Sequence, residues 1–472
     1  MIDVKQTVNE RAESSRTALT VMLGAVFMVL ADVFIATIAT PAIRADLAAD
    51  TLHIQLALAL YNVSYGALLL GGARLGDRFG NRRMFLAGCV FFGLASAVCA
   101  SAPSAEVLVI GRLLQGIGPA LLMPQVFTFI QVHLAESARL HAFAAFSAVS
   151  GIAAAGSQVI GGILIDLDLF GLGWRTVFWI NIPVMIAIVL LGIAKLPQSG
   201  GSRRAEIDGA GLAAVTIVLL ATTSALSFAQ HLPGIALVAV CLSVVGVVLA
   251  RAAFRRARRQ GRDTIIDTGV FQLPGFRGLL VSSLAYYAGN AILFSLLPVY
   301  LIGARGYSAA TAGLFFVALA GTFAVVSATL PRLVQAQPHL LLTVGSTALV
   351  LNYLLLALAL LLTRQLSAVV LVALLVLIGC TMGCIAPALN ALAVRLVPAA
   401  SASSASGLVT TALEVGYGLG AAIGIGSYAI AQTRAAEPGH ALAASLGIAT
   451  LLTIGLAMLV ARSTVSTAST PW

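Results

Sequence analysis

The feature that most constrains this chain is its series of long apolar runs. About fourteen stretches of roughly 20 apolar residues follow one another, each long enough to cross the hydrocarbon core of a bilayer as a helix. The chain has 472 residues and is 60% hydrophobic but only 9% charged, whereas about a quarter of a soluble domain is charged. We therefore predict an all-α polytopic membrane protein. The expected spans are 18–43, 52–73, 84–102, 107–129, 140–165, 175–194, 208–229, 235–253, 277–302, 309–330, 340–362, 367–393, 404–430 and 440–461.

The basic residues predict how these spans are oriented. Cytoplasmic loops of membrane proteins carry an excess of Lys and Arg, and most of the 27 Lys and Arg residues fall on the side of the N-terminus. The net charge of +10 is therefore explained by topology and does not indicate nucleic-acid binding. Both termini are expected in the cytoplasm. The basic residues on the opposite side are Arg44, Arg175, Arg305, Arg364 and Arg434.

Cysteines and histidines form no recognisable catalytic or metal-binding pattern. All five cysteines lie inside expected spans, which excludes a disulfide framework. Cys380 and Cys384 are one helical turn apart, but they lack His or carboxylate neighbours and are expected to pack as small side chains. The six histidines are scattered, and neither His-Glu-x-x-His nor Gly-x-x-x-x-Gly-Lys-Ser occurs. An enzyme, a metal and other cofactors are therefore not expected.

Residues 72–83, GARLGDRFGNRR, concentrate charge between two apolar runs. Gly76 and Gly80 permit backbone conformations that other residues resist. Asp77 stands among arginines, with which it can form charge-assisted hydrogen bonds that neighbouring helix ends make or break. Either the segment anchors a cytoplasmic loop or it acts as a gate. The gating residues would be Asp77, Arg78, Gly80, Arg82 and Arg83.

Residues 61–83 resemble the second span and following loop of the major facilitator superfamily. That family carries the pattern Gly-x-Leu-x-Asp-Arg-x-Gly-Arg-Arg, from which this chain departs at Ala73 and Asn81. The resemblance implies two six-helix bundles that alternate between inward-open and outward-open states about a midplane cavity.

The first expected span contains a carboxylate deep in apolar sequence, Asp32. Such a residue costs about 2.5 to 3.5 kcal/mol on insertion and is a functional candidate by default, although a packing hydrogen bond between helices is the alternative. The stretch resembles the first-span motif of fourteen-span drug:proton antiporters, Asp-x-Thr-Ile-Val-Asn-Val-Ala-Leu-Pro. Pro41 matches in register, whereas Phe34 and Thr37 replace the usual Thr and Asn.

The fourth expected span carries Arg112, the basic residue that lies well inside a span. With Gly116 and Gly118 it resembles the superfamily pattern Arg-x-x-x-Gly-x-Gly, in which the family resemblance implies a role in proton coupling. An arginine there can stabilise a nearby ionised carboxylate. The alternative is a side chain that reaches back to the membrane surface.

The fifth expected span resembles the antiporter motif Gly-x-x-x-Gly-Pro-x-x-Gly-Gly. Aligned on Gly161 and Gly162, the Gly-Pro pair becomes Ser157 and Gln158, so the proline expected to bend the helix is absent. Gln158 either faces the cavity or bonds to another helix. Residues 173–183, GWRTVFWINIP, resemble the antiporter block Trp-Arg-x-x-Phe-x-x-Asn-x-Pro, and we expect a structural role for them.

In the second half of the chain, Glu414 is the one acidic residue deep inside an expected span. Leu413 and Glu414 replace the Arg and Gln of the antiporter pattern Arg-Gln-x-Gly-x-x-x-Gly-x-Ala, which favours positively charged cargo and resembles exporters of quaternary ammonium compounds. Aromatic residues can hold a flat cation, although ordinary packing is equally open. The candidates for the substrate cavity are Tyr61, Tyr65, Tyr286, Tyr287, Asn290 and Phe294.

Recurring residues divide the chain into related halves. Pro41 in the first half corresponds to Pro298 in the second. Gly116 and Pro124 correspond in the same way to Gly379 and Pro387, with nearly the same separation along the sequence. Such a constant separation is expected for two related six-span bundles. The domains expected are a cytoplasmic tail at 1–17, a first bundle at 18–194, a linker with two inserted spans at 195–274, a second bundle at 275–461 and a cytoplasmic tail at 462–472.

The resemblance implies a proton-coupled antiporter that exports lipophilic, cationic drugs or antiseptics. Its expected partners are a small lipophilic substrate, protons and the lipid bilayer, with no nucleic acid. A monomer in the inner (plasma) membrane of a bacterium is expected, driven by the proton gradient in place of a cofactor. Two alternatives remain, a dedicated exporter of one endogenous metabolite or antibiotic, and a proton-coupled uptake symporter, which the altered fifth span keeps open.

Overall fold

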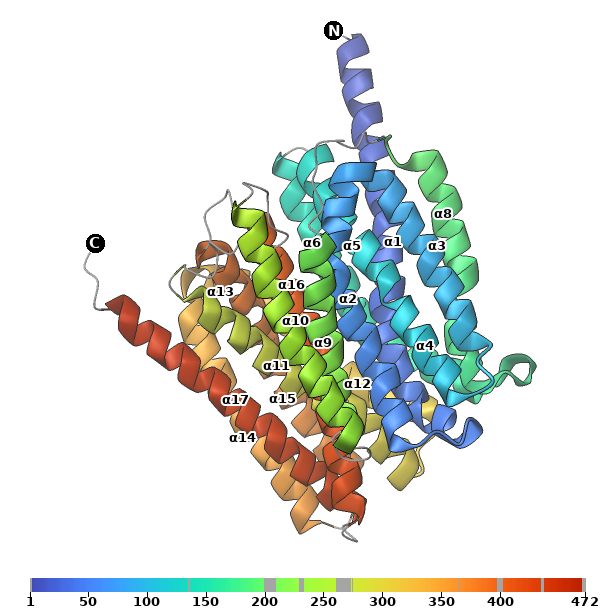
Figure 1. Cartoon of the computed structure of the whole chain (residues 1–472), viewed down its shortest axis with the longest axis vertical. Helices are drawn as coiled ribbons and strands as arrows, with labels where there is room; N and C mark the ends of the chain where they lie inside the picture. The colour runs from blue at the N-terminus through green and yellow to red at the C-terminus, as the bar shows by residue number, and fades with distance from the viewer. Residues whose placement is uncertain are drawn as a thin grey trace.

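A computed structural model shows the protein as a bundle of long helices (Figure 1). Within the residues that the structure describes, all regular secondary structure is helical. Those residues are 2–134, 136–198, 209–228, 233–259, 273, 275–363, 365–396, 402–433 and 437–468.

The described residues of the first half form eight α-helices, two pairs of which are separated only by a short break. Helices α4 and α5 form one span, as do α7 and α8. The bounds are α1 Ile2–Asp46, α2 Thr51–Phe79, α3 Asn81–Ala100, α4 Ala105–Gln115, α5 Ile117–His133, α6 Glu136–Asp166, α7 Thr176–Trp179 and α8 Asn181–Lys195, with short turns η1 Leu169–Gly171 and η2 Gly173–Arg175 before α7.

Two helices then precede the second half. They are α9 Gly209–Phe228 and α10 Pro233–Arg259. The helices of the second half are α11 Phe276–Pro298, its continuation η4 Val299–Ala304, α12 Ala309–Thr329, α13 Pro331–Ala336, α14 Pro338–Leu362, α15 Ala368–Leu396, α16 Ala402–Thr433 and α17 Pro438–Ala468.

The described residues contain 12 helical segments that are long and apolar enough to cross a membrane. The remaining two expected spans correspond to α9 and α10, whose apolar stretches are shorter, Gly209–Ala225 and Leu237–Ala253. The prediction of an all-α polytopic protein is therefore confirmed. Helix α1 already begins at Ile2, so the segment expected to be an N-terminal tail forms the first part of this helix.

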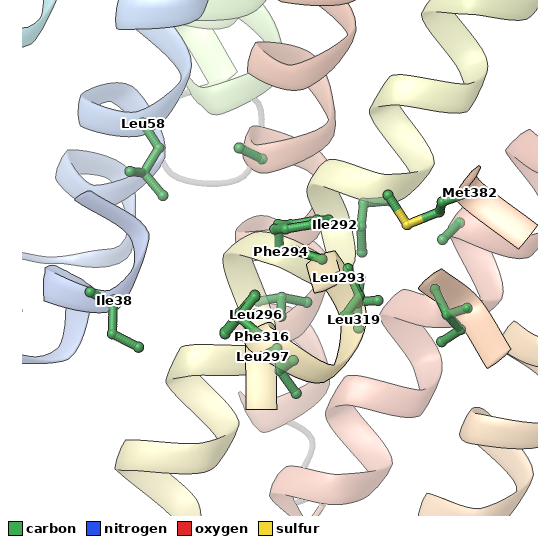
Figure 2. Packing of buried hydrophobic residues seen from close by; sticks show 14 of the residues in the cluster. Ile38, Leu58, Ile292, Leu293, Phe294, Leu296, Leu297, Phe316, Leu319 and Met382 are labelled. Atoms are coloured by element: carbon green, nitrogen blue, oxygen red, sulfur yellow. The ribbon is translucent and has the colours of Figure 1, made fainter. Parts of the chain in front are cut away.

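The outer surface of the bundle is apolar, as a lipid environment requires. Large side chains such as Leu94 and Val369 are 64% and 79% exposed. Exposing these apolar side chains to water would be unfavourable, whereas lipid tails solvate them well. Figure 2 shows the interior, where buried side chains of α11 and α12 pack together and Ile38 and Leu58 of the first half lie on the facing side.

The helix pairs that join the two halves include α1 with α11, α2 with α16, and α6 with α12. Glycines let these helices approach closely. A Cβ at Gly418 of α16 would meet the Ala59 carbonyl oxygen of α2 at 2.9 Å, and one at Gly313 of α12 would meet the Gln158 carbonyl oxygen of α6 at 2.6 Å. Helix α9 contacts both α2 and α16, so the inserted pair lies along this seam (Figure 1).

The charged segment at 72–83 is mostly helical. Helix α2 continues to Phe79 and α3 starts at Asn81, so that Gly80 alone breaks the chain direction with φ 95°. This positive φ suits glycine. Gly76 instead lies inside α2, where a side chain would collide with Gln125 of α5. The expectation that Gly76 forms part of the turn is therefore wrong. Its small size instead lets α2 pack closely against α5.

Candidate functional site

Asp32 of α1 lies at the centre of a buried polar cluster within the first half. Its side chain is 1% exposed, and its Oδ2 forms an ion pair with Arg112 of α4. Its other oxygen, Oδ1, accepts hydrogen bonds from Gln115 Nε2 at 2.9 Å and from Asn181 Nδ2 at 2.7 Å. Three donors from two further helices therefore hold this carboxylate.

Arg112 is buried to the same degree, with 2% of its surface exposed. Its Nε donates to the Ala57 carbonyl oxygen at 3.2 Å and its Nη1 also donates to Gln115 Oε1 at 2.7 Å. The guanidinium carbon lies 4.1 Å from the ring centre of Tyr61. Because a buried charge needs a partner and hydrogen bonds, this arrangement accounts for both charges. It excludes a side chain that reaches the membrane surface.

Ser96 of α3 completes the polar cluster. Its Oγ accepts from Gln115 Nε2 at 2.8 Å and from Asn181 Nδ2 at 3.2 Å, and donates to the Phe92 carbonyl oxygen at 2.8 Å. Sequence reasoning assigned no function to these side chains. Asn181 lies in residues 173–183, which resemble the antiporter block Trp-Arg-x-x-Phe-x-x-Asn-x-Pro. The Asn of that block is the sequence feature that could have pointed to Asn181.

The glycines of the fourth span position Arg112. Helix α4 ends at Gln115 and α5 begins at Ile117. A Cβ on Gly116 would collide with Ser64 and with the Tyr61 carbonyl group of α2, and one on Gly118 would lie 2.6 Å from the Phe92 Cβ of α3. The small residues therefore bring α2 and α3 against the turn that follows Arg112.

Glu414 has a different environment. Glu414 lies on α16 where this helix packs against α2, and its side chain is 5% exposed. The packing is close, because an ideal Cβ on Gly66 of α2 would stand 2.9 Å from the Glu414 Cβ. It forms no ion pair with any residue that the structure describes. The phenol groups of Tyr65, Tyr287 and Tyr417 lie within electrostatic range of the carboxyl group.

A small cavity lies between the two halves, beside Arg112. It has a volume of about 20 Å³, whereas pockets for drug-sized ligands have about 300 to 1,000 Å³. Phe34 of α1 reaches across it, with its ring 5.4 Å from that of Phe294 and 6.4 Å from that of Tyr417. The lining residues are Val33, Phe34, Thr37, Leu58, Asn62, Arg112, Ala291, Phe294, Ser295, Tyr417 and Ala421.

We call this space between the two halves the midplane cavity. Of the six residues expected to line the substrate cavity, Phe294 lines it. Two others are engaged in helix packing, since Tyr61 donates to the Val29 carbonyl oxygen at 3.2 Å and Tyr286 to that of Met382 at 3.2 Å. Asn290 accepts from the Tyr353 hydroxyl at 2.7 Å. Tyr65 is buried beside Glu414, and the Tyr287 ring lies 5.5 Å from that of Tyr417.

The residues of the fifth-span motif join helices and do not line the midplane cavity. Gln158 of α6 donates to Thr37 Oγ1 of α1 at 2.9 Å. Of the two expectations for Gln158, a bond to another helix is therefore the one that the structure shows. Ser157 is fully buried beside it. Gly161 adjoins Ile35 of α1, and a Cβ on Gly162 would collide with the Ala309 carbonyl group at the start of α12.

The expected gating residues lie at the ends of α2 and α3. Asp77, Arg78 and Arg83 are exposed. Arg82 donates to the Ile193 carbonyl oxygen of α8, which fastens the turn to the first half. Among the described residues Asp77 forms no ion pair, although Arg74 lies within electrostatic range. Within the part of the chain that the structure describes, the ion pairs expected of Asp77 are therefore not formed.

Two helical bundles, the first of which holds a buried pair of an acid and an arginine, are the architecture of membrane transporters built from two related halves. Residues 21–421 match the Major Facilitator Superfamily, and the chain belongs to that family. The resemblance seen in the sequence is therefore confirmed. Family membership and the transporter relatives described next indicate a transporter and not an enzyme.

Three curated bacterial proteins show the range of relatives. The probable actinorhodin transporter of Streptomyces coelicolor is 33% identical over 299 residues, which cover 63% of this chain and 52% of that protein. The puromycin resistance protein pur8 of Streptomyces alboniger is 32% identical over 415 residues, 86% of this chain and 80% of that one. The multidrug efflux pump LfrA of Mycolicibacterium smegmatis is 28% identical over 409 residues, 86% and 79% of the two chains. The match thus spans about half of the first protein and most of the other two.

Solved structures share the fold. A POT family transporter in complex with a thioalcohol-conjugated peptide matches with a TM-score of 0.71 at 17% identity, over 96% of this chain and 97% of that one. A bacterial homologue of the human lysosomal transporter Spinster, inward-facing and occupied, matches with a TM-score of 0.65 at 15% identity, over 96% of each chain. At such identities the likeness concerns the fold alone.

Proposed function

We propose that the protein is a proton-coupled antiporter that exports lipophilic, cationic compounds across the inner (plasma) membrane of a bacterium. The observation that carries this proposal is the pair of buried carboxylates in contrasting environments. Asp32 is neutralised by Arg112, whereas Glu414 has no described cationic partner. In this proposal the chain works as a monomer without a cofactor, and the proton gradient supplies the energy.

Asp32 acts as the proton-coupling group. In its ionised form it accepts hydrogen bonds from Gln115 and Asn181 and pairs with Arg112. A proton that adds to the carboxylate removes the negative charge, so Arg112 loses its anionic partner. Because a buried unpaired cation is unfavourable, the helices around it then favour another arrangement. One charge that crosses the membrane potential contributes about 2.3 kcal/mol per 100 mV, which drives the cycle.

Glu414 is the proposed partner of a cationic substrate. A carboxylate and surrounding phenol rings together attract a lipophilic cation, by charge and by the ring quadrupole. Tyr417 contributes to both features, since it lies near Glu414 and lines the midplane cavity. The site is thus continuous with the seam between α2 and α16.

The midplane cavity must enlarge for transport. Its volume of about 20 Å³ admits no drug-sized molecule. Movement of one half against the other would open it to each side of the membrane in turn. We propose that the turn of Asp77, Arg78, Gly80, Arg82 and Arg83 acts as the cytoplasmic gate in this movement.

The names of the relatives support export over uptake. They include a resistance protein and a multidrug efflux pump. A dedicated exporter of one endogenous antibiotic is the second candidate, because other relatives are named as an actinorhodin transporter and a cephamycin export protein. Neither name identifies the cargo of this chain.

Transport by the purified protein in proteoliposomes tests the proposal. An ethidium-like cation and a neutral drug of similar size are offered with and without an imposed pH gradient. Gradient-driven movement of the cation, with a weaker response for the neutral drug, is expected. Transport that ignores the gradient would exclude antiport. Failure to move either compound would favour the dedicated exporter.

A further inference from the structure

Helix α10 is the outer member of the inserted pair. It packs chiefly against α9, beside which it runs in Figure 1, and an ideal Cβ on Gly246 of α10 would lie 2.8 Å from Val218 Cγ2 of α9. Its other sides are apolar and open, since Leu237, Val244 and Val248 are 65%, 59% and 58% exposed. Lipid tails are the surroundings that such a helix requires.

The last turns of α10 are strongly basic. Residues 251–259 contain five arginines, and residues 209–259 contain no Asp or Glu. The flanking stretches 196–208 and 260–275 hold three more arginines against four acidic residues, so a surplus of positive charge remains. Four of the five side chains are described, and all four are exposed without an ion pair to any described residue. This arginine cluster consists of Arg251, Arg255, Arg256 and Arg259.

The length of α10 places the arginine cluster at the depth of lipid headgroups. Its 27 residues extend about 40 Å, and a bilayer with its headgroup layers is about 40–45 Å thick. The apolar stretch Leu237–Ala253 occupies the hydrocarbon core, so the arginines at its end reach the headgroup layer. They lie on the same side of the bundle as the N-terminus (Figure 1), the face that the basic residues predict to be cytoplasmic.

Membrane topology alone requires less than this arrangement. An excess of basic residues in a loop is enough to orient a span, whereas here the arginines end a continuous helix. Arg251, Arg255 and Arg259 are spaced four residues apart and therefore lie along one side of it. A guanidinium group can bind a phosphate group through two parallel hydrogen bonds. The cluster can thus hold several phosphate groups at once.

We propose that the arginine cluster of α10 is a binding surface for anionic phospholipid headgroups of the cytoplasmic leaflet. Charge complementarity selects this occupant, because anionic lipids give that leaflet a negative surface potential that attracts basic segments next to a span. A zwitterionic headgroup carries a compensating ammonium group and binds less tightly. The surface is separate from the substrate and from protons, so the proposal does not rest on antiport.

The inserted pair connects the arginine cluster to the seam between α2 and α16. Thr222 Oγ1 of α9 donates to Ser243 Oγ of α10 at 3.2 Å. At the start of α9, Leu212 reaches α2 so closely that an ideal Cβ on Gly71 would lie 2.5 Å from it. Helix α9 also contacts α16. Lipid held at the end of α10 therefore anchors the pair beside the contact between the two halves.

Fluorescence quenching by brominated lipids tests this surface. Ala252 is exposed among the arginines, and Ala252→Trp places a reporter there in the full-length protein. The protein is reconstituted in phosphatidylcholine vesicles that contain rising fractions of phosphatidylglycerol or phosphatidylcholine brominated near the headgroup. The emission gained over the protein without this tryptophan is measured. Phosphatidylglycerol should reach half-maximal quenching at a mole fraction about tenfold lower than phosphatidylcholine.

Substitution of the arginines should remove this preference. The triple variant Arg255→Gln/Arg256→Gln/Arg259→Gln should be quenched equally by both lipids. Its counterpart with three lysines keeps the charge and should retain most of the preference. If the glutamine variant fails to insert, Arg255→Gln alone should lower the preference by about two- to fivefold.

The N-terminal segment supplies a matched control. Residues 2–16 contain three basic residues, Lys5, Arg11 and Arg16, which three acidic residues balance. The variant Lys5→Gln/Arg11→Gln/Arg16→Gln removes the same charge as the glutamine variant of α10 from the face predicted to be cytoplasmic. It should leave the preference for phosphatidylglycerol unchanged.

Equal quenching by the two lipids before any arginine is replaced would overturn the proposal. So would an undiminished preference in the glutamine variant of α10. An equal loss in the N-terminal control would show that only the total charge matters, and no binding surface would remain on α10. Absence of a lipid preference together with tight binding of poly-glutamate to the solubilised protein would assign the cluster to an acidic protein partner instead.

Discussion

At the scale of single residues, the site depends on how two buried acids are compensated. Asp32 has an arginine and two amide donors, whereas Glu414 has phenol groups nearby and no described ion pair. Removing one partner of a buried ion pair costs about 3–5 kcal/mol, because the other charge remains buried. The two acids should therefore respond differently to neutralisation.

Asp32→Asn should abolish proton-driven efflux while the protein still inserts into the membrane. It leaves Arg112 buried without its anion, so the thermal stability of the purified variant should also fall. The double variant Asp32→Asn/Arg112→Gln removes both charges and should regain part of that stability without regaining efflux. Efflux and melting temperature are measured side by side. Undiminished gradient-driven transport by Asp32→Asn would remove this residue from the mechanism.

Glu414→Gln should impair export of cationic compounds strongly and of neutral compounds weakly, because only a cation gains from the negative charge. The measurement is efflux of one cationic and one neutral compound of similar size. Glu414→Asp keeps the charge and is the control, expected to retain preference for the cation. Equal loss of both compounds, or loss of neither, would contradict a cation site.

At the scale of helices, the two halves touch through specific ends. Asp166 at the end of α6 accepts hydrogen bonds from the backbone N–H groups of Ala309 at 3.1 Å and Ala310 at 2.9 Å, which begin α12. A carboxylate at a helix N-terminus contributes about 0.3 to 1 kcal/mol. The contact joins the halves at the face predicted to be extracellular.

Asp166→Ala should therefore shift the protein towards conformations open to that face by about two- to fivefold. The readout is labelling of Ala421→Cys, a residue of the midplane cavity, by a membrane-impermeant thiol reagent. Asp168→Ala is the matched control, because Asp168 accepts from the backbone of Gly173 within the first half. Equal labelling in both variants would mean that the α6–α12 contact carries no such bias.

A second prediction at this scale concerns the turn between α2 and α3. Asp77 is exposed and lies within electrostatic range of Arg74. If the turn acts as a gate, Asp77→Asn should lower the turnover rate more than it lowers the affinity for substrate. Binding and turnover are measured on the same preparation. A variant equal to the parent in both quantities would reduce the turn to a topological anchor.

At the scale of the whole molecule, the proposed movement separates the halves along α6 and α12. Gly151 of α6 and Ala324 of α12 face each other there, with 3.4 Å between the Ala324 Cβ and an ideal Cβ on Gly151. This distance is close to the Cβ–Cβ separation of about 3.5–4.5 Å found in disulfides.

The double variant Gly151→Cys/Ala324→Cys should therefore form a disulfide on mild oxidation and stop transport. A reductant should restore it, because the bond alone prevents separation of the halves. The two single-cysteine variants, treated in the same way, control for the native cysteines. Transport by the fully cross-linked protein would show that this pair of helices does not separate during the cycle.

The spans and the family were readable from the sequence because they depend on local properties. Apolar runs of sufficient length must become helices in a bilayer, where unpaired backbone groups are costly. A lone acid or arginine inside such a run is conspicuous for the same reason. Asp32, Arg112 and Glu414 could therefore be singled out without knowledge of their neighbours, whereas their roles stay proposals.

The tertiary structure alone decided which side chains meet. Asn181 donates to Asp32 and to Ser96 of another helix, and Tyr286 donates to the Met382 carbonyl group and does not line the midplane cavity. In a soluble helix an apolar stripe marks the buried face. Lipid tails are as apolar as a protein core, so a membrane helix can be apolar all round, and its sequence does not reveal which face lines a cavity. Helix packing settles that choice.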